Sequence, residues 1–345
     1  MDGEGLQAVA PMAAPARDDD LAVMIAVPTL RRPRELARLL DRLPATIEAA
    51  IEQGSCARVD VVVIDNDPSG SAADVVRSAS LPVRYAPEPQ PGLSAVRNRA
   101  LDESACHDML VFIDDDETPA AEGWLARLLD TQRVTGAGVV AGPVRTVIEG
   151  EWDPWIVAGG FYARAHRSGL QTRDRIAGAA TNNLLLDVAA VRRAGVRFDS
   201  RFGATGGEDS FFTAQLGAAG VEMVWCADAI VEDHLLSARQ TRAHALVRSR
   251  GMAAAGVRVS LALAEGAPAR RARVRARGLC AALMRIAVGS ARGLGARVSG
   301  STRLDAIGAR DIARGVGQLE GVIGRNRALY GLDGGGAPAV REETS

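Results

Sequence analysis

The chain has 345 residues, of which 47% are hydrophobic and 24% charged, and a net charge of −1. This is the composition of a globular protein that can bury a sizeable core. Its apolar runs stay below the ~18 to 20 residues of a membrane span, so the sequence argues against a transmembrane protein. Four scattered cysteines exclude a zinc knuckle and a disulfide framework and fit a reducing cytosol. The segment 1–20 lacks the features of a signal peptide and is predicted to be a disordered leader.

Up to residue 113, apolar runs of strand length alternate with segments of helical periodicity. Continuous apolar runs fit a parallel sheet that helices cover on both faces. The predicted strands are 21–27, 59–64, 83–85 and 109–113. One predicted helix begins at Pro33, and two more cover 72–78 and 95–103. Ser94 is predicted to cap the last of them.

The alternation becomes irregular in the second half. A helix over 124–133 and a strand over 138–144 precede the segment 145–180, whose Trp and Gly content is typical of a binding loop. Its tryptophans are equally consistent with loop anchors that pack on the sheet. Further predicted elements are a helix that Gly206–Ser210 opens and that runs through Gln215, an edge strand at 221–225, and a helical, Arg-rich segment after residue 239.

Polar residues follow the predicted strands at their carboxyl ends. In open α/β sheets that edge is where ligands bind, often where the strand order switches. Neither a Gly-x-Gly-x-x-Gly fingerprint nor a Gly-Lys-Ser/Thr loop is present, which disfavours dinucleotide oxidoreductases and phosphate-loop ATPases. The polar groups at the edge are Thr29, Arg31, Asp65, Asn66, Arg97, Asn98 and Asp114–Asp116.

Three consecutive carboxylates, Asp114–Asp116, end the strand at 109–113. Like charges gathered at one strand end suit a hard cation such as Mg²⁺ or Mn²⁺, although a solvated acidic turn gives the same pattern. Glu208 and Asp209 open a helix, where the dipole favours acids, or where one of them serves as a base. His234 is open to both an ordinary packed role and a ligand role.

Five stretches together resemble the family 2 inverting glycosyltransferases of the GT-A fold, over roughly residues 21 to 255. The wording of the first half is most similar to the succinoglycan-biosynthesis glucosyltransferase branch. The stretches are Val27-Pro28-Thr29, Val63-Ile64-Asp65-Asn66, Gly92-Leu93-Ser94-Ala95-Val96-Arg97-Asn98, Phe112-Ile113-Asp114-Asp115-Asp116 and Gly206-Gly207-Glu208-Asp209.

The resemblance implies an α/β fold of GT-A type, a mostly parallel Rossmann-like sheet flanked by helices, with a C-terminal helical appendage. It implies Asp209 as the catalytic base and Mg²⁺ or Mn²⁺ held by Asp116 and Asp114, with His234 as a further candidate ligand. The implied nucleotide-sugar site comprises Pro28, Thr29, Arg31, Asp65, Asn66, Arg97, Asn98, Asp114 and Asp115. Acceptor binding is assigned to Glu208, Trp155 and Asn182. By strand alternation, Asp115 is expected to face away from Asp114 and Asp116.

The implied activity is metal-dependent transfer of a sugar from a nucleoside diphosphate to a hydroxyl of a glycan or lipid-linked glycan, in exopolysaccharide or cell-surface polysaccharide synthesis. A sugar nucleotidylyltransferase and a non-catalytic binding subunit of a polysaccharide assembly complex are the alternatives. The predicted domains are a catalytic domain at 21–240, divided into a nucleotide-sugar half (21–120) and an acceptor half (121–240), an Arg-rich helical appendage at 241–327 and a flexible tail at 328–345.

The C-terminal segment is strongly basic. Residues 270–327 contain 13 Arg against three acidic residues. Helices of this charge suit the anionic inner face of a membrane, which predicts a cytoplasmic protein that is peripheral at the membrane. A solvated helical face is the alternative. A nucleic-acid surface is disfavoured because aromatic residues do not interleave the arginines.

Overall fold

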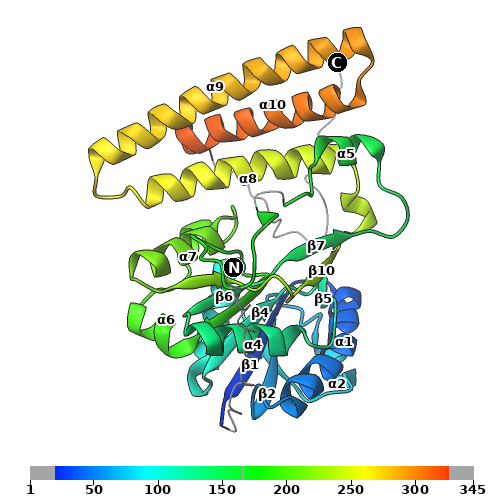
Figure 1. Cartoon of the computed structure of the whole chain (residues 1–345), viewed down its shortest axis with the longest axis vertical. Helices are drawn as coiled ribbons and strands as arrows, with labels where there is room; N and C mark the ends of the chain where they lie inside the picture. The colour runs from blue at the N-terminus through cyan, green and yellow to red at the C-terminus, as the bar shows by residue number, and fades with distance from the viewer. Residues whose placement is uncertain (1–19, 165–166, 326–345) are drawn as a thin grey trace, which may run out of the picture.

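The computed structural model describes residues 20–164 and 167–325. The predicted leader, apart from Asp20, and the predicted tail at 328–345 lie outside these residues. A seven-stranded sheet forms the centre (Figure 1). Its strands are β1 (Ala22–Thr29), β2 (Arg58–Asp65), β3 (Val83–Pro87), β4 (Met109–Ile113), β6 (Val139–Ala141), β8 (Asn183–Asp187) and β9 (Met223–Trp225).

The strand order is β3-β2-β1-β4-β8-β6-β9. All neighbours pair in parallel except β8, which is antiparallel to both β4 and β6. The chain runs outward from β1 through β2 to β3 and then returns to the other side of β1 as β4. This reversal places a topological switch point between the carboxyl ends of β1 and β4, the usual ligand position in such sheets.

Helices cover both faces of this sheet, as the alternation predicts. The helices are α1 (Pro33–Glu52), α2 (Ala73–Ser78), α3 (Leu93–Glu103), α4 (Trp124–Thr135), α6 (Val188–Ala194) and α7 (Glu208–Ala218). Side chains of α1 and α4 share one apolar core with alternate residues of β1, and those of α3, α6 and α7 share the other. Four leucines of α1 are buried, each stabilising the fold by about 1.5–3 kcal/mol.

The start of α3 differs from the prediction. Ser94 lies inside the helix and donates its hydroxyl to the carbonyl of Asp199 at 2.8 Å, so it does not cap the helix. The residue before the helix is Gly92, whose φ of 108° only glycine adopts easily. A Cβ there would lie 3.3 Å from the backbone of Gly203, so the loop and the 200–203 turn can approach closely.

The predicted strand at 138–144 divides between two sheets, because Gly142 and Pro143 interrupt it. Gly142 has no space for a Cβ beside the carbonyl of Ala229, and Pro143 has no N–H for a ladder. A small second sheet, β5-β10-β7, results. Its strands are β5 (Glu117–Pro119), β7 (Val144–Val147) and β10 (Val231–His234). The segment 145–180 is less irregular than predicted, since it contains α5 (Pro154–Gly159).

A helical layer formed by α8 (Arg242–Ala262), α9 (Pro268–Ser299) and α10 (Thr302–Ile323) lies on the side of α5 and α7 (Figure 1). Val259 of α8 packs against Phe202 and Phe211 beside the start of α7. Contrary to the sequence-based argument, one 18-residue window of α9 reaches a mean hydropathy of 1.2, enough by length and composition alone to cross a membrane. The division into domains at residue 240 stays a prediction.

Candidate active site

Side-chain hydrogen bonds and ion pairs hold the acidic residues that follow β4 against the end of β1. Thr29 Oγ1 donates to Asp115 Oδ2 at 2.7 Å. The Arg32 guanidinium bridges two of the acids, with Nη1 at 2.9 Å from Asp115 Oδ1 and 2.7 Å from Asp116 Oδ2. Arg239 reaches Asp116 at 3.5 Å. Asp115 is buried and its bonds tie the two strand ends together. The expectation that it faces away from Asp116 is wrong, because one nitrogen of Arg32 contacts both carboxylates.

Asp114, the first of the three acids, lies in a different electrostatic environment. Burial raises the pKa of Asp114 to about 7, Arg97 opposes the rise, and the neighbouring charges of Asp116 and Asp115 add to it. Burial is the main cause of this shift, and the charges of the neighbouring acids add to it. A cation bound beside Asp114 would stabilise its charged form and oppose this rise.

A fourth acid, Glu117, lies behind Asp114. Its Oε1 accepts from Asn182 Nδ2 at 2.5 Å and its Oε2 accepts from the backbone N–H of Asp114 at 3.4 Å. Burial raises the pKa of Glu117 well above its usual value, with contributions from Asp114 and Asp116. Glu117 thus connects Asn182, a predicted acceptor residue, to the acidic strand end.

The second pair of predicted acids lies in the first turn of α7. Gly207 precedes them with a φ of 101°, and a Cβ there would lie 2.9 Å from Val259 of α8. Glu208 is buried and its Oε1 forms an ion pair with Arg97 of α3. Its Oε2 is buried without a hydrogen-bond partner among the residues that the structure describes. Asp209 is partly exposed, and its Oδ1 accepts from the Ser210 N–H at 2.6 Å.

Asp65, at the end of β2, is bonded to its own loop. It accepts from the N–H groups of Asp67 and Ala72 at 2.9 and 3.0 Å and from the Tyr85 hydroxyl at 3.0 Å. Arg31 lies close by, 3.2 Å from Asp67, with an unusual φ of 54°. Backbone strain of this kind concentrates at ligand sites, which supports a binding role for the 29–32 turn.

Asn66 holds the loop that precedes α3. Its Nδ2 donates to the carbonyls of Glu88 and Gln90, both at 2.8 Å, and its Oδ1 accepts from the Gly92 N–H at 2.9 Å. These three side-chain hydrogen bonds all go to that loop. Asn66 therefore holds this loop of the predicted nucleotide-sugar site in shape.

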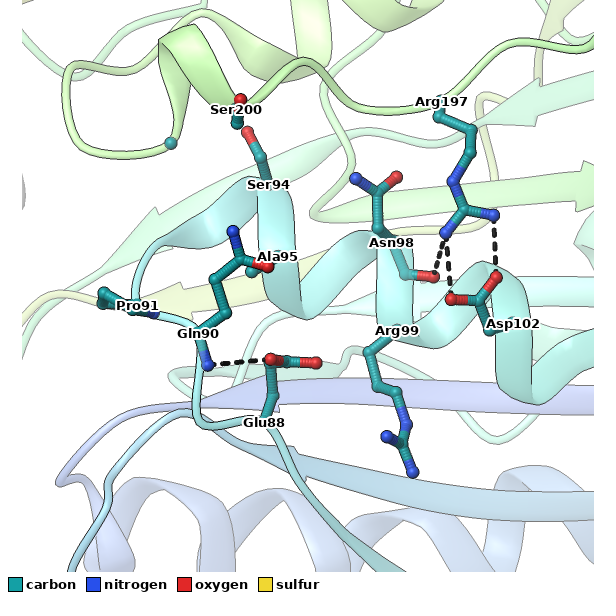
Figure 2. Close-up of a pocket in the computed structure, with 11 residues that line it drawn as sticks. Glu88, Gln90, Pro91, Ser94, Ala95, Asn98, Arg99, Asp102, Arg197 and Ser200 are labelled. Atoms are coloured by element: carbon teal, nitrogen blue, oxygen red, sulfur yellow. Dashed lines mark hydrogen bonds and ion pairs between the residues drawn. The ribbon is translucent and has the colours of Figure 1, made fainter.

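Two residues of the predicted nucleotide-sugar site make contacts that belong to the fold itself. Asn98 exchanges hydrogen bonds with the backbone of Phe198, at 2.8 and 2.9 Å, and Pro28 is buried within β1 opposite Ile64. Asn98 also lines a cavity of about 250 Å³ on the outer side of α3, where Arg197 and Asp102 form an ion pair (Figure 2). The predicted metal and catalytic residues are not among the residues that line this cavity.

The predicted metal ligands do not form a ready cluster. His234 Nε2 is hydrogen-bonded to the Thr118 hydroxyl at 2.8 Å, and within 20–164 and 167–325 no three His, Cys, Asp or Glu side chains are grouped to hold a metal. Mg²⁺ commonly takes only one or two carboxylates and completes its shell with water and substrate phosphates. Two carboxylates such as Asp114 and Asp116 would meet that requirement, and the metal-binding roles of Asp114, Asp116 and His234 stay predictions.

Trp155 corrects the predicted acceptor site. Its side chain is 5% exposed, stacks on Phe161 with ring centroids 5.0 Å apart, and lies under the guanidinium of Arg242. Its indole N–H donates to Asp305 of α10 at 2.6 Å. Because it is buried among these groups, Trp155 anchors the helical layer and offers no stacking surface to a sugar.

Sequence analysis missed Arg32, Glu117 and Arg239 as members of the cluster. For two of them the sequence gives a partial indication of their position. Glu117 directly follows the acidic triplet, and Arg32 follows Arg31 in the loop after β1. Arg239 is 123 positions from Asp116, and a basic residue in a turn carries no signal of that contact.

Comparison with known proteins identifies the family. A sequence model described as "Glycosyltransferase like family 2" matches residues 21–254. The succinoglycan biosynthesis protein ExoM of Rhizobium meliloti (strain 1021) is 36% identical over 220 residues, which is 63% of this chain and 68% of that protein. The chain belongs to the family 2 glycosyltransferases. This membership favours the transferase over the nucleotidylyltransferase and the non-catalytic subunit considered above.

Solved structures similar to this glycosyltransferase have the GT-A fold. The mannosyltransferase PcManGT from Pyrobaculum calidifontis, solved with GDP-Man and Mn²⁺, is 17% identical with a TM-score of 0.55, covering 91% of each chain. S. aureus TarS 1-349, solved with UDP-GlcNAc, is 14% identical with a TM-score of 0.50, covering 88% of this chain and 92% of that one. The predicted fold class is therefore confirmed.

Proposed function

We propose that this glycosyltransferase moves a sugar from a nucleoside-diphosphate sugar to a hydroxyl of a glycan or lipid-linked glycan, with inversion and with help from Mg²⁺ or Mn²⁺. The pathway proposed is exopolysaccharide or cell-surface polysaccharide synthesis, as for the succinoglycan biosynthesis relative. We further propose a cytoplasmic enzyme that is peripheral at the membrane.

The convergence of two acid groups at the switch point carries this proposal. Arg97 is ion-paired with Glu208 and also lowers the pKa of Asp114, so the start of α7 and the end of β4 share one cationic neighbour. An arrangement with acids on two sides suits a reaction that needs a cation at one side of the sugar and a base at the other.

Each residue has a task in this proposal. The loop that Asn66 shapes and the strained turn at Arg31 bind the nucleotide. Asp114 and Asp116 would hold the cation, which as a Lewis acid neutralises charge that develops on the departing diphosphate. Asp209 takes the proton of the acceptor hydroxyl, and the unpartnered Oε2 of Glu208 accepts a hydrogen bond from the acceptor. Transfer without a covalent intermediate then inverts the anomeric centre.

A donor screen tests the proposal. The full chain is incubated with Mn²⁺ and individual nucleotide sugars, and the released product is identified. Release of nucleoside diphosphate is expected for one donor, with opposite anomeric configurations in donor and product. Asp114→Asn should lower turnover by at least about a hundredfold, since metal charge stabilisation is worth several kcal/mol.

The matched control is Asp41→Asn, a change at an exposed acid of α1, which should leave turnover unchanged. Release of pyrophosphate from a nucleoside triphosphate and a sugar phosphate would overturn the proposal in favour of a nucleotidylyltransferase. Donor binding without hydrolysis or transfer to any acceptor would favour a binding subunit.

A further inference from the structure

Helix α9 has one face that packs on the protein and one that does not. The packed face carries the small residues Ala282, Gly289 and Ala296, all buried. A Cβ at Gly289 would lie 2.7 Å from the carbonyl oxygen of Gly308 in α10, so the two helices are in close contact. Figure 1 shows α9 at the end of the molecule farthest from the central sheet, with α10 beside it.

Large apolar side chains occupy the other face of α9. Met284 is 66% exposed, Leu294 63% and Val298 85%. Helical spacing places Leu283 and Met284 three and four residues after Cys280, which is itself exposed. We call this surface the α9 outer face; its apolar residues are Leu279, Leu283, Met284, Val288, Leu294 and Val298. Large apolar side chains exposed together on one face of a helix indicate a surface that binds a partner or a membrane.

The charge of α9 indicates what binds there. The helix contains eight arginines and no acidic residue. Within the described residues, only Arg285 and Arg292 of these arginines form ion pairs, both with Asp311 of α10. The other arginines include Arg273 and Arg277, which are exposed at the edge of the outer face. Apolar groups flanked by positive charge are complementary to a surface of anionic lipid.

A groove of about 580 Å³ between α8, α9 and α10 adjoins this face. Arg277, Arg285 and Arg314 line it together with apolar side chains such as Met252, which is 57% exposed. Charged and apolar lining in one groove suits an amphiphile with an anionic headgroup.

We propose that the α9 outer face docks in the plane of an anionic lipid bilayer, with one anionic headgroup entering the groove. The apolar side chains enter the interface and the arginines remain at the level of the phosphates. The helix lies in the plane and does not span, because spanning would pull Arg285 and Arg292 away from Asp311 and expose the α10 surface. This inference rests on the peripheral membrane association proposed above and specifies the surface that makes it, but it does not depend on sugar transfer.

Natural cysteines supply the test. Cys280 lies on the α9 outer face, Cys106 is exposed beside β4, and Cys56 and Cys226 are buried. The full chain with Cys106→Ser is labelled at Cys280 with an environment-sensitive fluorophore, and the chain with Cys280→Ser is labelled at Cys106. Vesicles containing phosphatidylglycerol should shift the Cys280 fluorophore to the blue and leave the Cys106 fluorophore unchanged, while phosphatidylcholine vesicles should shift neither.

Flotation with the same vesicles measures the affinity. Arg273→Gln with Arg277→Gln should weaken binding about thirtyfold, at about 1 kcal/mol per arginine, and Leu283→Glu with Met284→Glu should abolish it. Val134→Glu, at an exposed apolar residue of α4, is the matched control and should float like the unmodified chain. Binding should weaken as salt rises.

Three outcomes would overturn the proposal. The chain could remain in the soluble fraction with anionic vesicles, or both labelled cysteines could respond equally. The third is a chain that resists extraction by 1 M salt and by alkaline carbonate, which would identify α9 as a membrane span. Each outcome is independent of sugar transfer, so failure of this proposal leaves the proposed enzymatic function standing.

Discussion

Replacement of Arg97 by methionine should remove the ion pair that joins α3 to the start of α7 in the candidate site. Arg97 and Glu208 are 5% and 3% exposed and form an ion pair between α3 and α7. Removal of one partner leaves a buried carboxylate without its cation, which typically costs 3–5 kcal/mol. We therefore expect Arg97→Met to lower the free energy of unfolding by about 3–5 kcal/mol.

The loss should depend on pH in a defined direction. Burial already raises the pKa of Glu208, against the effect of Arg97 and with a contribution from Asp209. Without Arg97 that pKa rises further, so the folded state holds a proton that the unfolded state releases, and stability falls as pH rises above the unfolded value. The deficit of Arg97→Met relative to the unmodified chain should therefore be smaller at pH 5 than at pH 8.

Urea unfolding of four chains measures the effect: unmodified, Arg97→Met, Glu208→Gln and the double variant. The double variant should lose less stability than the two single variants combined, because removing both charges leaves neither one buried and unpaired. A loss below 1 kcal/mol in Arg97→Met, with additive single effects and no pH dependence, would refute the inference that this ion pair joins α3 to α7.

Three further predictions concern the metal, the donor loop and the helical layer. With the pKa of Asp114 raised to about 7, protons compete with the cation, so calorimetry should show Mn²⁺ affinity about tenfold lower at pH 6 than at pH 8; equal affinities would argue against Asp114 as a ligand. Asn66→Ala removes three hydrogen bonds and should lower the free energy of unfolding by roughly 2–3 kcal/mol and raise KM for the donor; unchanged values of both would contradict its role in the loop. Trp155→Ala should cost about 3–5 kcal/mol in thermal unfolding without changing KM for the acceptor; a selective rise in that KM at unchanged stability would restore Trp155 to the acceptor site.

Sequence patterns predicted the parts of this fold that have strong local signals. Continuous apolar runs ending in polar residues gave β1, β2 and β4, and leucines at helical spacing gave α1. The same polar residues mark the switch-point edge, so the position of the candidate site follows from the strands. A resemblance to the family then gave the individual residues their proposed roles.

The remaining features depend on contacts between distant parts of the chain. β5 has three residues and no periodicity of its own, and it exists because it pairs with β10, more than a hundred positions later. Trp155 looked suitable for stacking on a sugar, but its partner Asp305 lies 150 positions away. Arg32 could not be distinguished from Arg31 by type or position, although only Arg32 bridges Asp115 and Asp116.

Asp209, in the first turn of α7, is the residue proposed to remove the proton from the acceptor hydroxyl. The most direct test compares kcat and donor affinity for Asp209→Asn and the unmodified chain, with Asp41→Asn as the control. A general base contributes about 10²–10⁴-fold, so kcat should fall by that factor while the donor Kd stays within about twofold. Full turnover in Asp209→Asn would contradict the role of Asp209 as the base, and so would a loss of donor affinity that accounts for the whole effect.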